Sequence, residues 1–110
     1  GFDGSMAYSF AKHQYTELEM TKKFIKNIIW FLIRKPDIIL SHSPPFKLHD
    51  AEDLPHRGFK VFVFIINHFS PKIWIHGHTH LRNHMEIQES VVKNTKVINT
   101  YGYKVIDIEI

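Results

Sequence analysis

Two apolar segments that each lead directly into a histidine-containing turn constrain the fold of this chain most. Residues 37–40 form a short strand candidate that ends near His42, and residues 72–75 form a second one that leads into the histidine cluster at 76–80. The sequence between them predicts a helix over residues 58–69, apolar nearly all round and therefore buried against a sheet. A strand, a crossover of this length and a second strand are expected to run parallel, so both histidine groups should emerge at the carboxyl edge of one sheet.

A second, longer helix is predicted over residues 16–35. Thr16 and Glu19 have the spacing of a capping box, and apolar residues then recur at helical spacing until Pro36 ends the helix. Residues 1–15 show no clear period, so we expect loop or edge structure there.

The last part of the chain is predicted to be β-structure. Alternation of apolar and polar residues indicates strands at 84–88, 96–99 and 103–110, and Tyr101-Gly102 is expected to form the turn between the last two strands.

The composition favours one globular domain, or part of one, in a soluble and cytoplasmic protein. The chain has 110 residues, of which 44% are hydrophobic, enough to form a core. Its longest apolar runs fall well short of the roughly 20 residues of a membrane span, and no signal peptide is recognisable. It contains no cysteine, so any transition metal would have to be held by imidazole and carboxylate groups.

The charge pattern argues against nucleic acid as a partner. Lys and Arg exceed Asp and Glu by 14 to 11, but the excess is spread along the chain and forms no basic block. A solvated basic face is the favoured interpretation, and a small substrate that carries phosphate would suit it equally well.

The histidines that follow the two strands are the candidate metal ligands. His42, His78 and His80 would converge from separate loops, as a divalent transition metal requires. Gly77 has no Cβ, so we expect the backbone to bend there and to turn His78 and His80 toward a common point. His76 shares a strand face with His78 and is a candidate either for ligation or for contact with a ligand, with an ordinary strand residue as the alternative.

The stretch Gly77-His78-Thr79-His80, placed directly after an apolar strand, resembles the last metal-binding motif of the calcineurin-like metallophosphoesterases. Residues 40–45 are similar to that family's Gly-His motif, with Ser41 in place of the glycine, and residues 97–103 are similar to the terminal strands of small bacterial members. The resemblance spans nearly the whole chain but only the second half of the family's domain. It implies an α/β fold, a metallophosphoesterase-type β-sandwich flanked by helices, here represented by its second half.

The resemblance also implies a dinuclear metal site for phosphoester hydrolysis. His42 and His78 would hold one divalent ion and His80 the other, with Mn, Fe, Zn or Mg as the candidate metals. Such ions activate water and clamp the phosphoryl oxygens. The chain contains no Asp-x-His, Gly-Asp or Gly-Asn-His motif, which in the family supply the bridging aspartate, other ligands and a proton donor.

Three neutral ligands cannot offset the charge of two dications. We therefore expect this chain to be the carboxyl half of a longer enzyme, or one product of a split gene, and to be inactive without the missing amino-terminal half or a complementing chain. The first residue, Gly1 rather than methionine, agrees with that expectation.

Residues 46–57 predict a surface loop that could overhang the sheet edge. His56 and Arg57 in this loop are candidates for contact with a substrate phosphate, with a solvent-exposed pair as the alternative. An acidic cluster at residues 49–53 could replace a missing carboxylate, although loop acids are usually solvated.

The sequence thus predicts a metal-dependent phosphoester hydrolase with no membrane partner. Two alternatives stay open at this point. One is a non-catalytic metal-binding or interaction module. The other is a basic nucleic-acid-binding domain, whose binding would depend steeply on salt and would survive a chelator.

Overall fold

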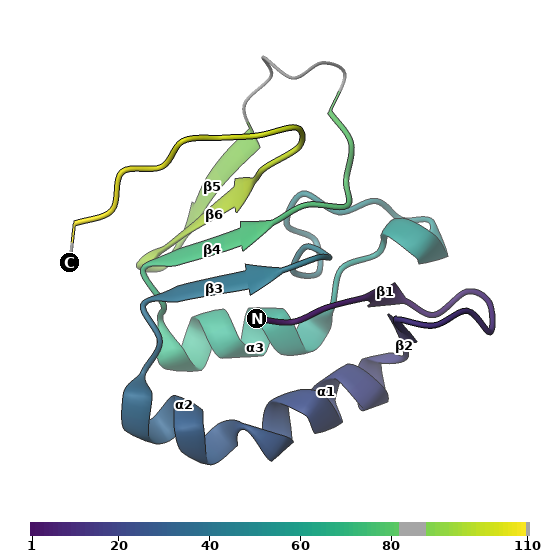
Figure 1. Cartoon of the computed structure of the whole chain (residues 1–110), viewed down its shortest axis with the longest axis horizontal. Coiled ribbons are helices and arrows are strands. Elements are labelled where there is room, and N and C mark those ends of the chain that lie inside the picture. Colours follow the sequence, from purple (N-terminus) through teal and green to yellow (C-terminus); the bar gives the residue numbers. More distant parts are fainter. Residues whose placement is uncertain (82–87, 110) are drawn as a thin grey trace.

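The computed structural model describes residues 1–81 and 88–109, and its centre is a four-stranded sheet with helices against one face (Figure 1). The strands are β1 (Ser5–Met6), β2 (Gln14–Tyr15), β3 (Ile38–Ser41), β4 (Ile73–His76), β5 (Gln88–Val92) and β6 (Thr95–Asn99). The helices are α1 (Glu17–Lys26), α2 (Ile28–Arg34), the 3₁₀ turn η1 (Leu54–His56) and α3 (Lys60–Phe69). The predicted mixed α/β class is therefore confirmed.

The predicted parallel pairing of the two histidine-bearing strands is confirmed. The sheet has the order β3-β4-β6-β5, in which β3, β4 and β6 run parallel and β5 runs antiparallel to β6. Ser41 at the end of β3 pairs with His76 at the end of β4. The turns that carry His42 and His78 therefore leave the sheet side by side at its carboxyl edge. Helix α3 forms the crossover between the two strands, as predicted.

The helix predicted over residues 16–35 is instead two helices. The capping box at its start is confirmed, with Glu19 N–H donating to Thr16 Oγ1 and Thr16 N–H donating to Glu19 Oε1, both at 3.1 Å. At Asn27, however, the side chain donates to the Lys23 carbonyl, 2.9 Å away, and the residue ends α1 before α2 begins. An asparagine amide competes in this way with the regular helical hydrogen bonds, so the continuous helix is wrong.

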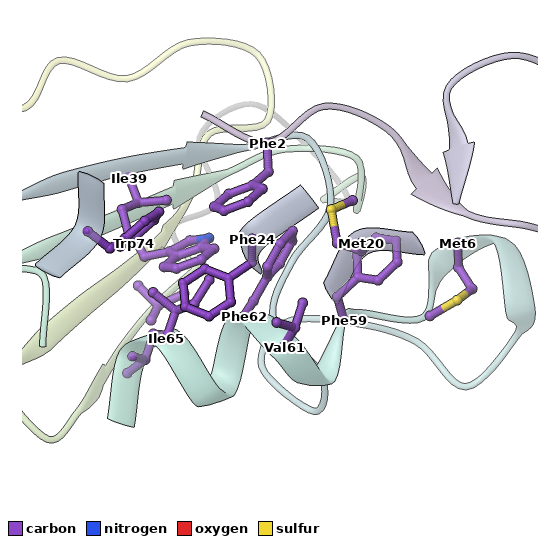
Figure 2. Packing of buried hydrophobic residues seen from close by; sticks show 13 residues of the cluster. Phe2, Met6, Met20, Phe24, Ile39, Phe59, Val61, Phe62, Ile65 and Trp74 are labelled. Carbon is purple, nitrogen blue, oxygen red and sulfur yellow. The ribbon is translucent and has the colours of Figure 1, made fainter. Parts of the chain in front are cut away.

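Aromatic packing between the sheet and the helices fixes the two strands that carry the site (Figure 2). Trp74 on β4 is fully buried, with its ring 5.0 Å from that of Phe62 on α3 and 6.3 Å from that of Phe2. Glu17 on α1 accepts hydrogen bonds from the Lys60 and Val61 amides at the start of α3. A carboxylate at a helix amino terminus stabilises the helix, so this contact ties α1 to the crossover helix.

The carboxyl-terminal strands are only partly as predicted. Residues 96–99 lie in β6 as expected, but β6 pairs with β5 through a turn at Lys93-Asn94 that the sequence analysis missed. Of the strand predicted at 84–88, residues 84–87 lie outside the described residues, and Gln88 begins β5. The strand predicted at 103–110 is wrong for 103–109, which have no regular secondary structure and pair with no strand in the described chain.

The last correction has a physical reason. Alternation in sequence marks a segment that could be a strand, but a strand forms only where a neighbour accepts its hydrogen bonds. Tyr103 and Val105 are 83% and 82% exposed. The bend at Gly102, with φ of 79°, therefore leads into an irregular segment rather than into a hairpin. Among the described residues, no helix has the length and apolar character needed to cross a bilayer.

Candidate metal centre

The structure brings two of the three predicted ligands into direct contact. His42 follows β3 and His78 follows β4, and the Nε2 atom of His42 lies 2.9 Å from the Nδ1 atom of His78. The two ring centroids are 4.6 Å apart. Zinc–nitrogen bonds of about 2.0–2.1 Å in a tetrahedral site separate two ring nitrogens by roughly 3.3 Å. A small outward rotation of either ring, together with a shift of the proton on His42 Nε2 to its Nδ1 atom, would therefore admit a cation between the two nitrogens.

Hydrogen bonds from Ser41 and Ser43 hold the turn of His42 in place. The Ser41 hydroxyl accepts from the buried indole N–H of Trp74 at 2.8 Å and donates to the Ser43 carbonyl at 2.6 Å. The Ser43 hydroxyl in turn donates to the Gly4 carbonyl at 2.9 Å. Ser41 thus connects the His42 turn to the central tryptophan of the core.

The bend that turns His78 toward His42 lies at His78 itself, not at Gly77 as expected. His78 has φ of 64°, whereas Gly77 is not among the residues with positive φ. A Cβ at Gly77 would come no closer than 3.9 Å to the His42 carbonyl oxygen, an ordinary contact. The conformational freedom of Gly77 therefore does not shape this turn. The left-handed backbone conformation of His78 does.

A backbone carbonyl fixes the orientation of the His78 ring. The His78 Nε2 atom lies 2.7 Å from the Pro55 carbonyl oxygen, which can only accept, so the proton is on Nε2. The lone pair of Nδ1 then faces His42. Metal-binding histidines are commonly oriented by such a bond from the other ring nitrogen. Partial burial and then the proximity of His78 lower the pKa of His42, which favours the neutral form that binds metal.

His80 is placed differently from the other two candidates. Its ring stacks on the ring of Tyr101 at a centroid distance of 4.8 Å. Within residues 1–81 and 88–109, no group of three or more His, Asp or Glu side chains is arranged to hold a cation. His42 and His78 therefore form a pair of possible ligands, and further ligands would have to come from elsewhere.

The polar loop at residues 46–57 overhangs the sheet edge as predicted. Its base is closed by backbone hydrogen bonds from Phe46 N–H to the Phe59 carbonyl and from Phe59 N–H to the Pro44 carbonyl. Gly58 permits this closure, because a Cβ there would lie 2.4 Å from the carbonyl oxygen of Pro45. The closed loop places the Pro55 carbonyl within hydrogen-bonding distance of the His78 ring.

The loop also places His56 beside the histidine pair. The His56 ring stacks on the His78 ring at 5.0 Å, and its Nδ1 atom lies 2.5 Å from Asp53 Oδ2. This hydrogen bond lowers the pKa of the Asp53 carboxyl. Arg57, in contrast, donates to the Glu52 carbonyl at 3.0 Å and lines an open cavity of about 710 Å³ together with Lys47 and Lys60.

Two of the three carboxylates in the predicted acidic cluster are bonded to groups in or next to the loop. Asp50 accepts from the Gly58 amide at 2.9 Å, and Asp53 pairs with His56. These carboxylates do not join the His42–His78 pair as a group of three.

His76 is buried, with 1% of its surface exposed, and both ring nitrogens are bonded. Its Nδ1 atom lies 3.0 Å from the Gly77 carbonyl oxygen and its Nε2 atom 2.9 Å from Nδ1 of His49. Burial lowers the pKa of His76 to about 4, with a smaller contribution in the same direction from His49. The Nε2 atom of His49 is in turn hydrogen-bonded to the Ser90 hydroxyl, 2.7 Å away. The sequence analysis did not single out Ser90, and no motif or spacing around it would have done so.

Comparisons with protein families, with curated proteins and with solved structures gave no match to this chain. The geometry of the site itself is therefore the basis for the function proposed below.

Proposed function

We propose that this chain is the carboxyl half of a metallophosphoesterase-type domain, a helix-flanked β-sandwich, and that its activity is metal-dependent phosphoester hydrolysis. The observation that carries the proposal is the opposed pair of imidazole nitrogens, 2.9 Å apart, on turns that follow two parallel strands. The fixed orientation of His78 by Pro55 supports it, because a preorganised imidazole binds a cation at lower entropic cost.

In this proposal His42 and His78 bind one divalent ion, of Mn, Fe, Zn or Mg, and His80 contributes to a second. When bound, the ions would supply water activation and charge neutralisation at the phosphoryl oxygens. Carboxylate ligands would come from a segment with the Asp-x-His and Gly-Asn-His motifs, which this sequence lacks. The proposed partner is therefore the amino-terminal half or a complementing chain.

His56 is the proposed contact for the substrate phosphate. Its ring lies against His78, and Asp53 holds its Nδ1 atom, so Nε2 is the nitrogen that remains to meet a phosphate oxygen. Arg57 together with Lys47 and Lys60 would attract an anionic substrate to the neighbouring cavity rather than contact the reacting group.

A non-catalytic metal-binding module is the second candidate. It is favoured by one observation, that the described residues provide a pair of imidazoles and no group of three ligands. Such a module would bind one ion per chain and would not turn over a phosphodiester.

The test has two stages. In the first, Mn²⁺ or Zn²⁺ is titrated into the wild-type chain and into His42→Ala, His78→Ala and the control His68→Ala, whose ring lies on α3 and bonds to the Phe64 carbonyl. Metal binding should be lost in His42→Ala and His78→Ala and kept in His68→Ala. In the second, hydrolysis of bis(p-nitrophenyl) phosphate is measured with the carboxylate-bearing half present. Turnover that depends on His78 supports the hydrolase, and metal binding without turnover supports the module.

A further inference from the structure

A second group of polar side chains, separate from the His42–His78 pair, connects a loop and two strands. The Ser90 hydroxyl lies 2.7 Å from His49 Nε2, the His49 Nδ1 atom lies 2.9 Å from His76 Nε2, and His76 Nδ1 lies 3.0 Å from the Gly77 carbonyl oxygen. These distances are those of direct hydrogen bonds throughout.

The Gly77 carbonyl at the end of this series of hydrogen bonds fixes which atom donates in each of them. The Gly77 oxygen can only accept, so His76 carries its proton on Nδ1 and presents the lone pair of Nε2. That lone pair accepts the proton on Nδ1 of His49, which leaves Nε2 of His49 as an acceptor. The Ser90 hydroxyl therefore donates to a neutral imidazole. A serine that donates to a histidine, itself held by a further acceptor, is the arrangement of an activated nucleophile.

The positions of the three residues suit these roles. His76 is almost completely buried on β4, where it can orient a neighbour but cannot meet a substrate. Ser90 is half-buried on β5, the edge strand of the sheet, so it is not enclosed in the core as His76 is. His49 is held in the left-handed region with φ of 63°, a conformation that costs energy in a non-glycine residue and is common at functional sites.

We propose that Ser90 is a nucleophile that accepts an acyl group from a carboxylic ester, with His49 as its general base and His76 as a positioning residue. The Ser90 oxygen forms a bond to the ester carbonyl carbon while its proton passes to His49 Nε2. The ester C–O bond then breaks, and the leaving alcohol takes that proton. Water attacks the acyl-serine with the same base, which releases the carboxylic acid and restores the hydroxyl. The reaction uses no metal, so it is independent of the phosphoesterase proposal.

The test uses diisopropyl fluorophosphate, which reacts with activated serines. The Ser90 oxygen forms a bond to phosphorus, the P–F bond breaks, fluoride leaves and the proton goes to His49. The wild-type chain is treated in the presence of EDTA, and the adduct is located by peptide mass spectrometry. We expect one adduct, on Ser90. Its absence, or equal labelling of Ser90→Ala, would overturn the proposal.

One variant tests the base without disturbing the backbone, and a second serves as its control. Asparagine tolerates the left-handed conformation but is not a base, so His49→Asn should keep the fold while labelling falls on the order of 100-fold. His13→Asn is the matched control, because His13 also has positive φ, 59°, and lies on the surface. Equal labelling rates for His49→Asn and the control would contradict the role of His49.

The positioning role of His76 needs a readout other than stability. Glutamine retains an oxygen that can accept from His49, whereas leucine does not. Under conditions in which both variants are folded, Ser90 should react with diisopropyl fluorophosphate faster in His76→Gln than in His76→Leu. Equal rates would show that His76 only fills space.

Discussion

The Nε2 atom of His42 and the Nδ1 atom of His78 face each other across 2.9 Å, at the ends of two parallel strands. No third histidine, aspartate or glutamate among the described residues joins them. The Pro55 carbonyl holds the His78 ring, and the Ser41 hydroxyl holds the backbone turn that carries His42.

Alanine at either position should abolish the binding of Zn²⁺ at the His42–His78 pair. Removal of a ligand should weaken binding by more than the roughly 10–100-fold that the loss of an outer contact causes. Because both side chains lie at the sheet edge, the urea midpoint should change little. Isothermal titration calorimetry of His42→Ala and His78→Ala checks this, and unchanged affinity in either variant would contradict the assignment.

The metal-free protein should lose stability as the pH falls from about 6.5 to 4. The folded pKa of His76 is about 4, below the value of about 6.5 expected in the unfolded chain. The unfolded state therefore binds more protons in this window, and protonation favours unfolding. The loss from His76 is of the order of 3 kcal/mol once the pH reaches 4, and His42 and His49, whose pKa values are also lowered, act in the same direction.

Urea unfolding at several pH values, with EDTA present, measures this dependence. Between pH 6.5 and 4, the free energy of unfolding of His76→Gln should fall clearly less steeply with decreasing pH than that of the wild type. Identical slopes would mean that His76 does not carry the effect.

The two glycines near the site should respond differently to alanine. A Cβ at Gly58 would meet the backbone of Pro45 at 2.4 Å, so Gly58→Ala should cost about 1–3 kcal/mol and open the loop that holds His78. Gly77→Ala should stay within about 0.5 kcal/mol of the wild type, because the space around it is open. Comparison of the two urea midpoints decides the matter, and a larger loss for Gly77→Ala would contradict this account of the turns.

Ser41 should stabilise the core as well as the His42 turn. In Ser41→Ala the buried indole N–H of Trp74 loses its acceptor, at a cost of about 1–3 kcal/mol. Replacement of Trp74 by Phe removes that donor, so Ser41→Ala should cost markedly less in the Trp74→Phe background. A double-mutant cycle of unfolding free energies measures the difference, and strictly additive costs would show that the hydrogen bond contributes nothing.

The sequence was sufficient to predict the elements that local patterns define. The capping box at Thr16, the crossover helix and the parallel pairing of the two histidine strands depend on nearby residues and on a general rule of chain connection. The break at Asn27 was not predictable in this way, because it depends on which of two hydrogen bonds the asparagine amide makes.

The site was predictable only at its centre. His42 and His78 were found because each follows a strand, but the roles of Pro55, His49 and Ser90 depend on how the 46–57 loop folds back over the sheet. That folding is set by the backbone contact at Gly58, and sequence spacing carries no signal for it. The strand expected after Gly102 was wrong for a similar reason, since alternation does not specify a pairing partner.

The most direct test of the central claim is a long-range ¹H–¹⁵N spectrum of the histidine rings, recorded with and without one equivalent of Zn²⁺. We predict that His42 Nε2 and His78 Nδ1 change together while His78 Nε2 keeps its proton, as its bond to Pro55 requires. If only one of the two rings responds, or if neither does, the two histidines do not share a cation and the proposed metal centre is wrong.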